Sequence, residues 1–279
     1  GDFDMFVGDF VGTISYYENT GSDINPIFTE QTSLNNPLND VNVASWCFPT
    51  FVDIDNDGDQ DVFIGEQDNY INYFDNTGSN NSPEFTEQTG TNNPFNGVYV
   101  SGGKSNPDFV DIDNDGDQDV FIGEQDGFIN YYSNTGSSNS PEFTEQTGIN
   151  NPFNGIDFGY ASDITFVDID NDGDFDALIG RYEGLIHFYK NTGISSSPEF
   201  TEQIGSSNPF DNIDVGRWST PEFVDINDDG DQDVFIGEQD GNISYYKNNT
   251  FYLLSGTPTN DNVGDNAVIL TTDDGTDTV

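Results

Sequence analysis

The stretch DIDNDGDQD, from Asp53 to Asp61, places five aspartates in nine residues, and the same nine letters return from Asp111 to Asp119. Close variants stand at residues 168–176 (DIDNDGDFD) and 225–233 (DINDDGDQD), so the motif recurs at intervals of 58, 57 and 57 residues. A fixed period of tens of residues is typical of repeat proteins, in which each copy is one structural unit.

The text around the acidic motif keeps the same interval. FIGEQD begins at Phe63, Phe121 and Phe235, and SPEFTEQ begins at Ser82, Ser140 and Ser197. The opening GDFDMFVGDF aligns with GDQDVFIGEQ, so Gly1 stands at the position of Gly58. The chain therefore holds four complete copies and one that lacks its beginning.

Each copy predicts four short strands separated by turn residues. In the first complete copy we expect strands at 50–54, 62–67, 70–74 and 84–88, because apolar residues alternate there between acidic, QDN and NTGSNNSP breaks. No segment shows a helical period. A repeated four-stranded unit predicts an all-β fold, a β-propeller of four-stranded antiparallel blades. An open β-solenoid is the alternative, although its rungs are usually much shorter than 57 residues.

The ends of the chain bear on the number of blades. We expect one domain over residues 1–279, with repeats at about 1–47, 48–105, 106–162, 163–219 and 220–262, and with 263–279 as a closing strand or a linker. If Val268 to Leu270 supplies the first strand that the N-terminal copy lacks, the ring has five blades, the last shared by both termini. If the tail is a linker, the chain is part of a larger ring, such as a seven-bladed one.

Composition excludes several classes of protein. With 52 acidic and 5 basic residues the formal net charge is −47, which repels nucleic acid and anionic membranes and attracts cations. The 24 Phe and 13 Tyr exclude a disordered acidic tail. No apolar run approaches the ~18 residues of a membrane helix. Cys47 is the single cysteine, so no disulfide forms within the chain. The opening residues do not read as a signal peptide, and we interpret the chain as a mature or excised piece.

The crowded aspartates predict a divalent cation among them. Ca²⁺ takes six to eight oxygens, and a loop with acids at positions 1, 3 and 5 and a glycine turn at position 6 supplies them. In the first copy these are Asp53, Asp55, Asp57 and Gly58, with the Asp59 carbonyl at position 7 and Asp61 closing the shell at position 9. Position 12 is Ile64, so the loop is not an EF-hand, and the all-oxygen set argues against zinc and copper. Mg²⁺ and a solvated turn that binds nothing remain as alternatives.

The same positions in every complete copy predict about one Ca²⁺ per repeat. The candidate ligands are Asp53, Asp55, Asp57, Asp59, Asp61, Asp111, Asp113, Asp115, Asp117, Asp119, Asp168, Asp170, Asp172, Asp174, Asp176, Asp225, Asn227, Asp229, Asp231 and Asp233.

The motif DxDxDGxxD, followed by VFIG, resembles the FG-GAP or VCBS repeat, a family that includes the propeller of integrin α subunits, fungal lectins and bacterial surface proteins. The resemblance implies Ca²⁺ in the hairpin between the first and second strands of a blade, with Asp53, Asp111, Asp168 and Asp225 at the first ligand position. Asn227 departs from Asp, and we expect a weaker site there. Asp2 and Asp4 offer only late ligands, and Thr276 and Thr278 replace the early ones poorly, which disfavours a fifth site.

Ligand-binding residues are sought where the copies differ most, just before each first strand. One such position holds Trp46, Lys104, Ala161 and Trp218, and the position before it holds Ser45, Gly103, Tyr160 and Arg217. In a propeller this segment rims the central channel on the face opposite the acidic loops. Aromatic rings stack on sugars, and Lys or Arg can bind a carboxylate or sulfate. The candidates are Trp46, Lys104, Tyr160, Arg217 and Trp218, and the alternative is that both tryptophans only fill gaps between blades.

A second departure is ALIGRYEGLIHFYK, which gathers Arg181, His187 and Lys190. We expect Arg181 to neutralise nearby carboxylates, with an anion contact as the alternative. The single histidine and the single cysteine have no partner motif, so we expect no enzyme.

These observations favour a secreted or cell-surface, calcium-binding propeller that acts as a binding or adhesion module for a glycan or a surface protein. The alternatives are a structural or assembly unit of a large surface protein and an accessory domain of a polysaccharide-active enzyme. The sequence does not indicate an oligomeric state.

Overall fold

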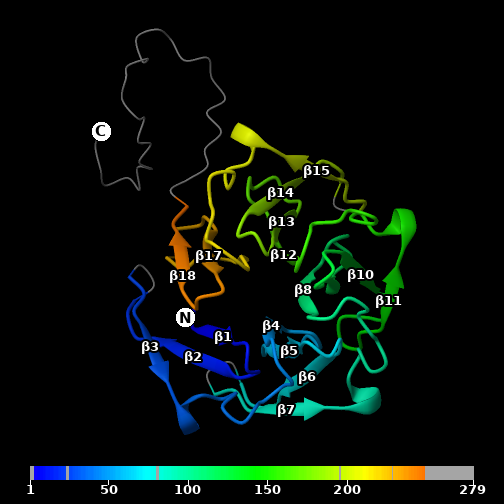
Figure 1. Cartoon of the computed structure of the whole chain (residues 1–279). Helices are drawn as coiled ribbons and strands as arrows, with labels where there is room; N and C mark the ends of the chain where they lie inside the picture. Colours follow the sequence, from blue (N-terminus) through cyan, green and yellow to red (C-terminus); the bar gives the residue numbers. More distant parts are fainter. Residues whose placement is uncertain (1–2, 23–24, 80–81, 195, 228, 249–279) are drawn as a thin grey trace.

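The computed structural model describes residues 3–22, 25–79, 82–194, 196–227 and 229–248, which form five antiparallel sheets around a common centre (Figure 1). The N-terminal blade contains β1 (Met5–Gly8), β2 (Ile14–Asn19) and β3 (Phe28–Gln31). Blade 1 contains β4 (Phe48–Val52), β5 (Asp61–Gly65), β6 (Ile71–Asn76) and β7 (Phe85–Gln88). Blade 2 contains β8 (Asn106–Val110), β9 (Asp119–Gly123), β10 (Ile129–Asn134) and β11 (Phe143–Gln146). Blade 3 contains β12 (Asp163–Val167), β13 (Asp176–Gly180), β14 (Ile186–Asn191) and β15 (Phe200–Gln203). Blade 4 contains β16 (Thr220–Val224), β17 (Asp233–Gly237) and β18 (Ile243–Tyr246).

The all-β propeller with five blades confirms the predicted fold class. Within each blade the strands follow chain order, with β4, β8, β12 and β16 innermost, and every pair is antiparallel. The strands begin and end within about two residues of the predicted bounds. The described helical turns are short 3₁₀ turns, η1 (Ser33–Asn35), η2 (Gly90–Asn92), η3 (Gly148–Asn150) and η4 (Gly205–Ser207). The predicted closing strand, Val268 to Leu270, lies outside the described residues.

Nothing among the described helices has the length and apolarity needed to cross a membrane.

The hydrophobic core lies between neighbouring blades. The second strand of blades 1, 2 and 3 is buried on both faces, because the adjacent blades cover it from either side. Phe63 stacks on Tyr73 of its own blade at 4.5 Å and meets Phe95 and Phe109, which precede and form part of blade 2. Phe121 repeats this arrangement one blade further on. The repeated VFIG sequence therefore holds the ring together as well as each sheet.

The aspartate at the start of each second strand ties that strand to the end of the third. The Asp61 Oδ1 accepts the backbone N–H of Asn76 at 2.7 Å, and its Oδ2 accepts the Tyr73 hydroxyl at 3.2 Å. The same backbone bond joins Asp4 to Asn19, Asp119 to Asn134, Asp176 to Asn191 and Asp233 to Asn248. Blade 3 has Phe188 in place of the tyrosine, which leaves the buried Asp176 Oδ2 without a hydrogen-bond partner among the described residues. Burial raises the pKa of Asp61 to about 6 and that of Asp119 to about 7.

The glycine that ends each second strand allows the next blade to approach. A Cβ at Gly123 would lie 2.2 Å from the Ser162 carbonyl oxygen, and one at Gly65 would lie 1.8 Å from that of Ser105. Ser162 and Ser105 lead into the first strands of the following blades. Gly237 occupies the same position in blade 4, but among the described residues its Cβ would meet only the Thr220 side chain. The glycine of the FIG tripeptide thus marks the point where the next blade contacts the second strand.

We predict that Gly123→Ala lowers the free energy of unfolding by at least about 1–3 kcal/mol, because two backbones must separate to admit a methyl group. Gly237→Ala is the matched control in the same local sequence, and it should cost less than about 1 kcal/mol because the Thr220 hydroxyl can move. Chemical denaturation followed by circular dichroism measures both values. Equal losses in the two variants would contradict this account of the glycine.

Candidate metal loops and channel mouth

Four acidic loops connect the first and second strands of blades 1 to 4. We name them loop 1 (Asp53–Asp61), loop 2 (Asp111–Asp119), loop 3 (Asp168–Asp176) and loop 4 (Asp225–Asp233). In loops 1 to 3 the aspartates at positions 1, 3 and 5 each place one carboxylate oxygen within 4.8 Å of the other two. Loop 4 has Asn227 at position 3, so two carboxylates remain at these positions.

The backbone of each loop is shaped by its first aspartate. The Asp53 carboxylate accepts the N–H groups of Asp57 and Gly58, both at 3.1 Å. Asn56 and Gly58 adopt positive φ angles of 58° and 98°, which asparagine and glycine tolerate better than other residues do. Loops 2, 3 and 4 repeat the bonds from positions 5 and 6 to position 1. These hydrogen bonds and φ angles fix the turn, and the turn brings the acidic side chains together.

The donor set fits a hard divalent cation. Carboxylate oxygens are the ligands that Ca²⁺ and Mg²⁺ take in proteins, and no thiolate or imidazole belongs to these clusters. Burial and then the carboxylate of Asp57 raise the pKa of Asp55, and burial and then Asp115 raise that of Asp113. These carboxyl groups are therefore harder to ionise in their present positions, and a bound cation would offset the energetic cost of their ionisation. Positions 1, 3 and 5 would hold the ion.

The predicted ligands at positions 7 and 9 of each loop are not part of these carboxylate clusters. The Asp59 N–H donates to Asp57 Oδ1 at 3.0 Å, and the equivalent bonds recur at Asp117, Asp174 and Asp231. The aspartates at position 9, namely Asp61, Asp119, Asp176 and Asp233, are buried at the root of the loop, where they hold the third strand. They are not among the carboxylates gathered within 4.8 Å, so a role for them in closing the metal shell stays a prediction.

At the other end of the first strands, the segments that lead into them line the mouth of the central channel. Trp46, Lys104, Ala161 and Trp218 all have positive φ, at 55°, 50°, 58° and 59°. Such a backbone costs of order 1–3 kcal/mol for a residue with a side chain. Backbone bonds hold it in place: Trp46 N–H donates to the Phe10 carbonyl at 3.2 Å, and Trp218 N–H to the Tyr182 carbonyl at 3.1 Å. From these turns the side chains of Trp46, Lys104 and Trp218 reach one another.

The two tryptophans meet across the channel. Trp46 belongs to blade 1 and Trp218 to blade 4, and the N-terminal blade separates these blades in the ring (Figure 1). Their rings stack with centroids 4.4 Å apart and planes 25° from parallel. Tyr160 and Tyr182 stand edge-on to Trp218 at 5.5 and 5.3 Å. Both tryptophans are half-buried. Each also contacts a ring of an adjacent blade, because Trp46 meets Phe10 of the N-terminal blade edge-on at 4.9 Å and Trp218 meets the blade 3 tyrosines.

Lys104 lies beneath this aromatic cluster. Its Nζ is 3.6 Å from the Trp46 ring centroid, 3.9 Å from that of Trp218 and 3.4 Å from the Tyr160 hydroxyl. The residue is 6% exposed. Burial lowers the pKa of Lys104 to about 8, whereas aromatic faces favour the ammonium form. The ammonium therefore predominates at neutral pH.

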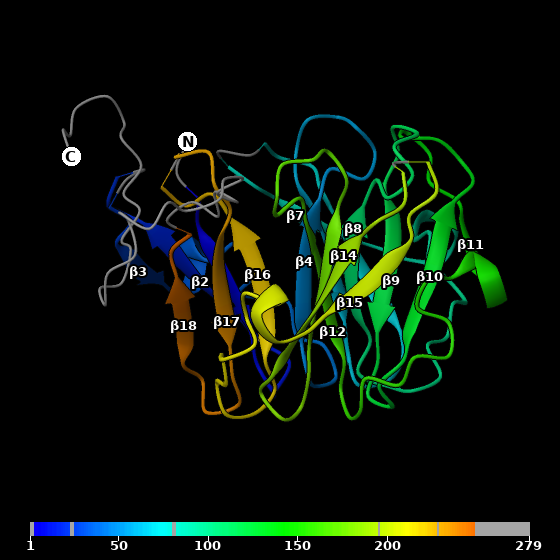
Figure 2. The same cartoon turned by 90° about the horizontal axis from the view of Figure 1, so that it is seen from above.

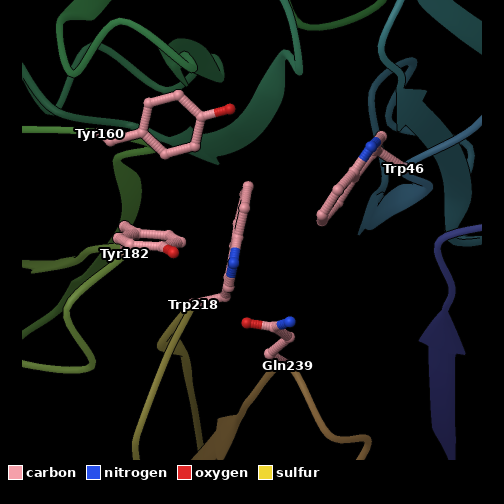
Figure 3. Close-up of a pocket in the computed structure, with 5 residues that line it drawn as sticks. All are labelled: Trp46, Tyr160, Tyr182, Trp218 and Gln239. Carbon is pink, nitrogen blue, oxygen red and sulfur yellow. The ribbon is translucent and has the colours of Figure 1, made fainter.

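An open depression of about 510 Å³ is lined by Trp46, Tyr160, Tyr182, Trp218 and Gln239 (Figure 3). Of the predicted ligand-binding residues, Trp46, Tyr160 and Trp218 line it, and Lys104 lies against it. Arg217 is exposed and faces Tyr182 at 5.4 Å, and it lines an adjoining depression with Glu238 and Asp240.

Sequence reasoning missed Tyr182 and Gln239, which stand in the turns between second and third strands. The signal was present at Tyr182, because that position is Gln67, Gln125 and Gln239 in the other complete copies. The sequence singles out Arg181 in this segment and predicts that it neutralises nearby carboxylates. Arg181 Nε indeed lies 2.7 Å from Glu183 Oε2. His187 bonds Arg181 and Glu202, and Lys190 lies apart from both, against loop 3.

Comparison with known proteins agrees with the repeat. The sequence model of the FG-GAP-like repeat matches residues 53–122 and 111–179. Residues 53–179 therefore carry FG-GAP-like repeats. Among curated proteins, none matches this chain. A solved structure, whose title describes specific recognition of non-reducing terminal N-acetylglucosamine by an Agrocybe aegerita lectin, is similar at 16% identity and a TM-score of 0.43. The similarity covers 87% of this chain and 62% of the lectin chain.

The lowered pKa of Lys104 predicts a pH dependence of stability. Above pH 8 the folded protein loses the Lys104 proton, while the unfolded chain keeps it up to its ordinary pKa of about 10.5, so the unfolded state binds more protons in this window. The free energy of unfolding of the wild type should therefore rise between pH 8 and 10.5 relative to Lys104→Met, which keeps a long apolar side chain and does not titrate. Denaturation of both proteins across that range measures the difference. A difference that falls with pH would mean that the aromatic rings raise this pKa above its ordinary value.

Proposed function

We propose that this protein is a secreted or cell-surface binding module that holds a saccharide ring at the channel mouth and uses calcium in its acidic loops for stability. The observation that carries the proposal is the depression lined by four aromatic rings and Gln239. Ligand sites are typically concave and largely apolar, with a few polar groups that orient the ligand. Aromatic faces pack against the C–H faces of sugars, and the Gln239 amide can both donate to and accept from hydroxyls.

Charge favours a ligand with an acidic group. The net charge of −47 repels anions over most of the surface, yet Lys104 and Arg217 place two of the five basic residues beside this depression. Glu238 and Asp240 line the adjoining depression, so the positive charge is local. A uronate or a sulfated sugar would find complementary charge beside the aromatic rings. The module then serves as an adhesion or glycan-binding unit.

The groups that could support enzyme chemistry favour a binding role without catalysis. Cys47 is buried, and burial raises the pKa of its thiol to about 12, so the nucleophilic thiolate does not form at neutral pH. Both nitrogens of His187 are engaged, Nε2 with Arg181 and Nδ1 with Glu202, each at 2.8 Å. Neither residue lines the aromatic depression.

Calcium is the metal we propose for the loops. It accepts the irregular, carboxylate-rich geometry that the turns impose, whereas Mg²⁺ demands a stricter octahedron. When bound, the ion would supply positive charge to three crowded aspartates and fix the turn between two strands. A secreted location agrees with this, because loops of this kind bind extracellular Ca²⁺ at its high concentration.

A packing role for the aromatic cluster is the second candidate. Trp46 and Trp218 cover part of each other and bury Lys104, so they also close the channel. In that case the protein is a structural or assembly unit of a larger surface protein.

Removal of calcium should lower the melting temperature. Binding to the folded state alone adds about 2.7 kcal/mol per site when free metal is a hundredfold above Kd, and EDTA removes that contribution. Asp57→Ala should lower the melting temperature in Ca²⁺, whereas Asp59→Ala should lower it much less because its backbone carbonyl is the expected ligand. Differential scanning calorimetry with Ca²⁺ and with EDTA makes the comparison. A melting temperature that EDTA leaves unchanged would remove calcium from the proposal.

The double variant Trp46→Ala, Trp218→Ala separates the binding and packing candidates. We expect it to abolish binding on a glycan array that includes uronate and sulfated sugars. We also expect it to stay folded, since Ala161 already occupies the equivalent strained position in blade 3. If the rings only pack, the same change should cost about 3–5 kcal/mol for each tryptophan. Tyr99→Ala is the control, because Tyr99 is an exposed aromatic residue that does not line the depression, and it should leave binding intact. Wild-type protein that binds nothing on the array would refute the saccharide proposal.

A further inference from the structure

The four acidic loops differ in one neighbouring residue. It stands two positions after the residue that faces the ninth aspartate, at or just past the end of the third strand. That position is Asp75 in blade 1, Ser133 in blade 2, Lys190 in blade 3 and Lys247 in blade 4. Its charge therefore changes from negative to neutral to positive around the ring, while the loops themselves stay nearly constant.

In blade 3 the lysine reaches the predicted metal ligands. Lys190 Nζ bonds the Asp170 carboxylate directly and lies 3.4 Å from Asp172 Oδ2. Asp168, Asp170 and Asp172 are the three carboxylates that the loop gathers within 4.8 Å. The ammonium thus contacts two of the three groups that would hold an ion.

In blade 4 a lysine makes the equivalent contacts. Lys247 Nζ lies 3.1 Å from Asp229 Oδ2 and 3.2 Å from Asn227 Oδ1. The Asn227 amide nitrogen donates to Asp233 Oδ2 at 2.7 Å, so both ends of that amide are engaged. The substitution of Asn for Asp at position 3 and the approach of the lysine both reduce the negative charge of this loop.

Blades 1 and 2 lack such a cation at this position. Asp75 occupies it in blade 1, where its carboxylate accepts the side-chain amide of Gln88 at 3.1 Å. Ser133 is uncharged. The three other basic residues, Lys104, Arg181 and Arg217, lie at the opposite end of the blades, near the channel mouth. Loops 1 and 2 therefore keep their full negative charge.

We propose that Lys190 and Lys247 act as built-in counter-cations that replace the metal in loops 3 and 4, so that tight calcium binding is confined to loops 1 and 2. The inference rests on the calcium part of the proposed function, and it restricts the one ion per repeat that the sequence predicts. Calcium affinity depends on the number of ligand charges, and a resident ammonium both lowers that number and repels an incoming divalent ion. Calcium could bind these two loops only after the lysine had left its carboxylates.

The test is calorimetric titration of Ca²⁺ into the full chain after chelation and dialysis, with equilibrium dialysis as an independent count of bound ions. We expect about two tight sites per wild-type chain. Lys190→Ser, which installs the residue of blade 2, should add a third site bound at least about tenfold more tightly than loop 3 of the wild type. Ser133→Lys, the reciprocal change, should remove one tight site. Lys247→Ser should strengthen loop 4 by less, because Asn227 remains.

Two controls separate this effect from others. Lys190→Arg keeps the charge and should leave the count at two. Arg181→Ser removes one positive charge at the other end of the same blade and should also leave it at two. Circular dichroism in excess Ca²⁺ verifies that each variant is folded.

Four equally tight sites in the wild type, or a count unchanged by both Lys190→Ser and Ser133→Lys, would overturn the inference while leaving calcium binding in place. No calcium uptake by the wild type would remove the calcium proposal and this inference with it.

Discussion

The whole ring depends on one aspartate in each blade, and this aspartate is buried in blades 1 to 4. Its carboxylate begins the second strand and accepts the backbone N–H at the end of the third, in all five blades, as Asp61 does for Asn76. A charged group at this depth is costly unless hydrogen bonds satisfy it, and these bonds do so only when the two strands are in register. The acidic loop, the buried VFIG strand and the next blade all follow from that alignment.

The distribution of the five basic residues separates the two ends of the propeller. Lys190 and Lys247 lie on acidic loops, whereas Lys104, Arg181 and Arg217 lie near the channel mouth. In a chain with 52 acidic residues each cation has many possible partners, so these positions are informative. At one end positive charge lies against the loop carboxylates, and at the other it is covered by aromatic rings. Our proposals accordingly assign stability and recognition to opposite faces of the same blades.

Much of the fold could be predicted because each repeat has the same local pattern of strand and turn residues. The strand boundaries followed from alternating apolar residues and glycine turns, and the clustering of the loop carboxylates followed from the spacing of Asp53, Asp55 and Asp57. The bonds made by Asp61 could not be predicted, because a ninth-position acid reads equally well as a metal ligand until its distance from Asn76 is known. Tyr182 and Gln239 were missed because their place beside the channel also depends on tertiary structure. The turns that carry them, in blades 3 and 4, approach the channel only when the ring closes.

The sequence by itself determined the period, the all-β class and the acidic turns, because these depend on residues that are neighbours along the chain. Only the tertiary structure decided what meets across the ring. Trp46 and Trp218 are separated by 172 residues and by a whole blade, yet their rings stack at 4.4 Å over Lys104. Lys190 reaches Asp170 across a hairpin for the same reason. Closure of the ring and strand pairing bring these groups together, and no local sequence pattern predicts the distance between them.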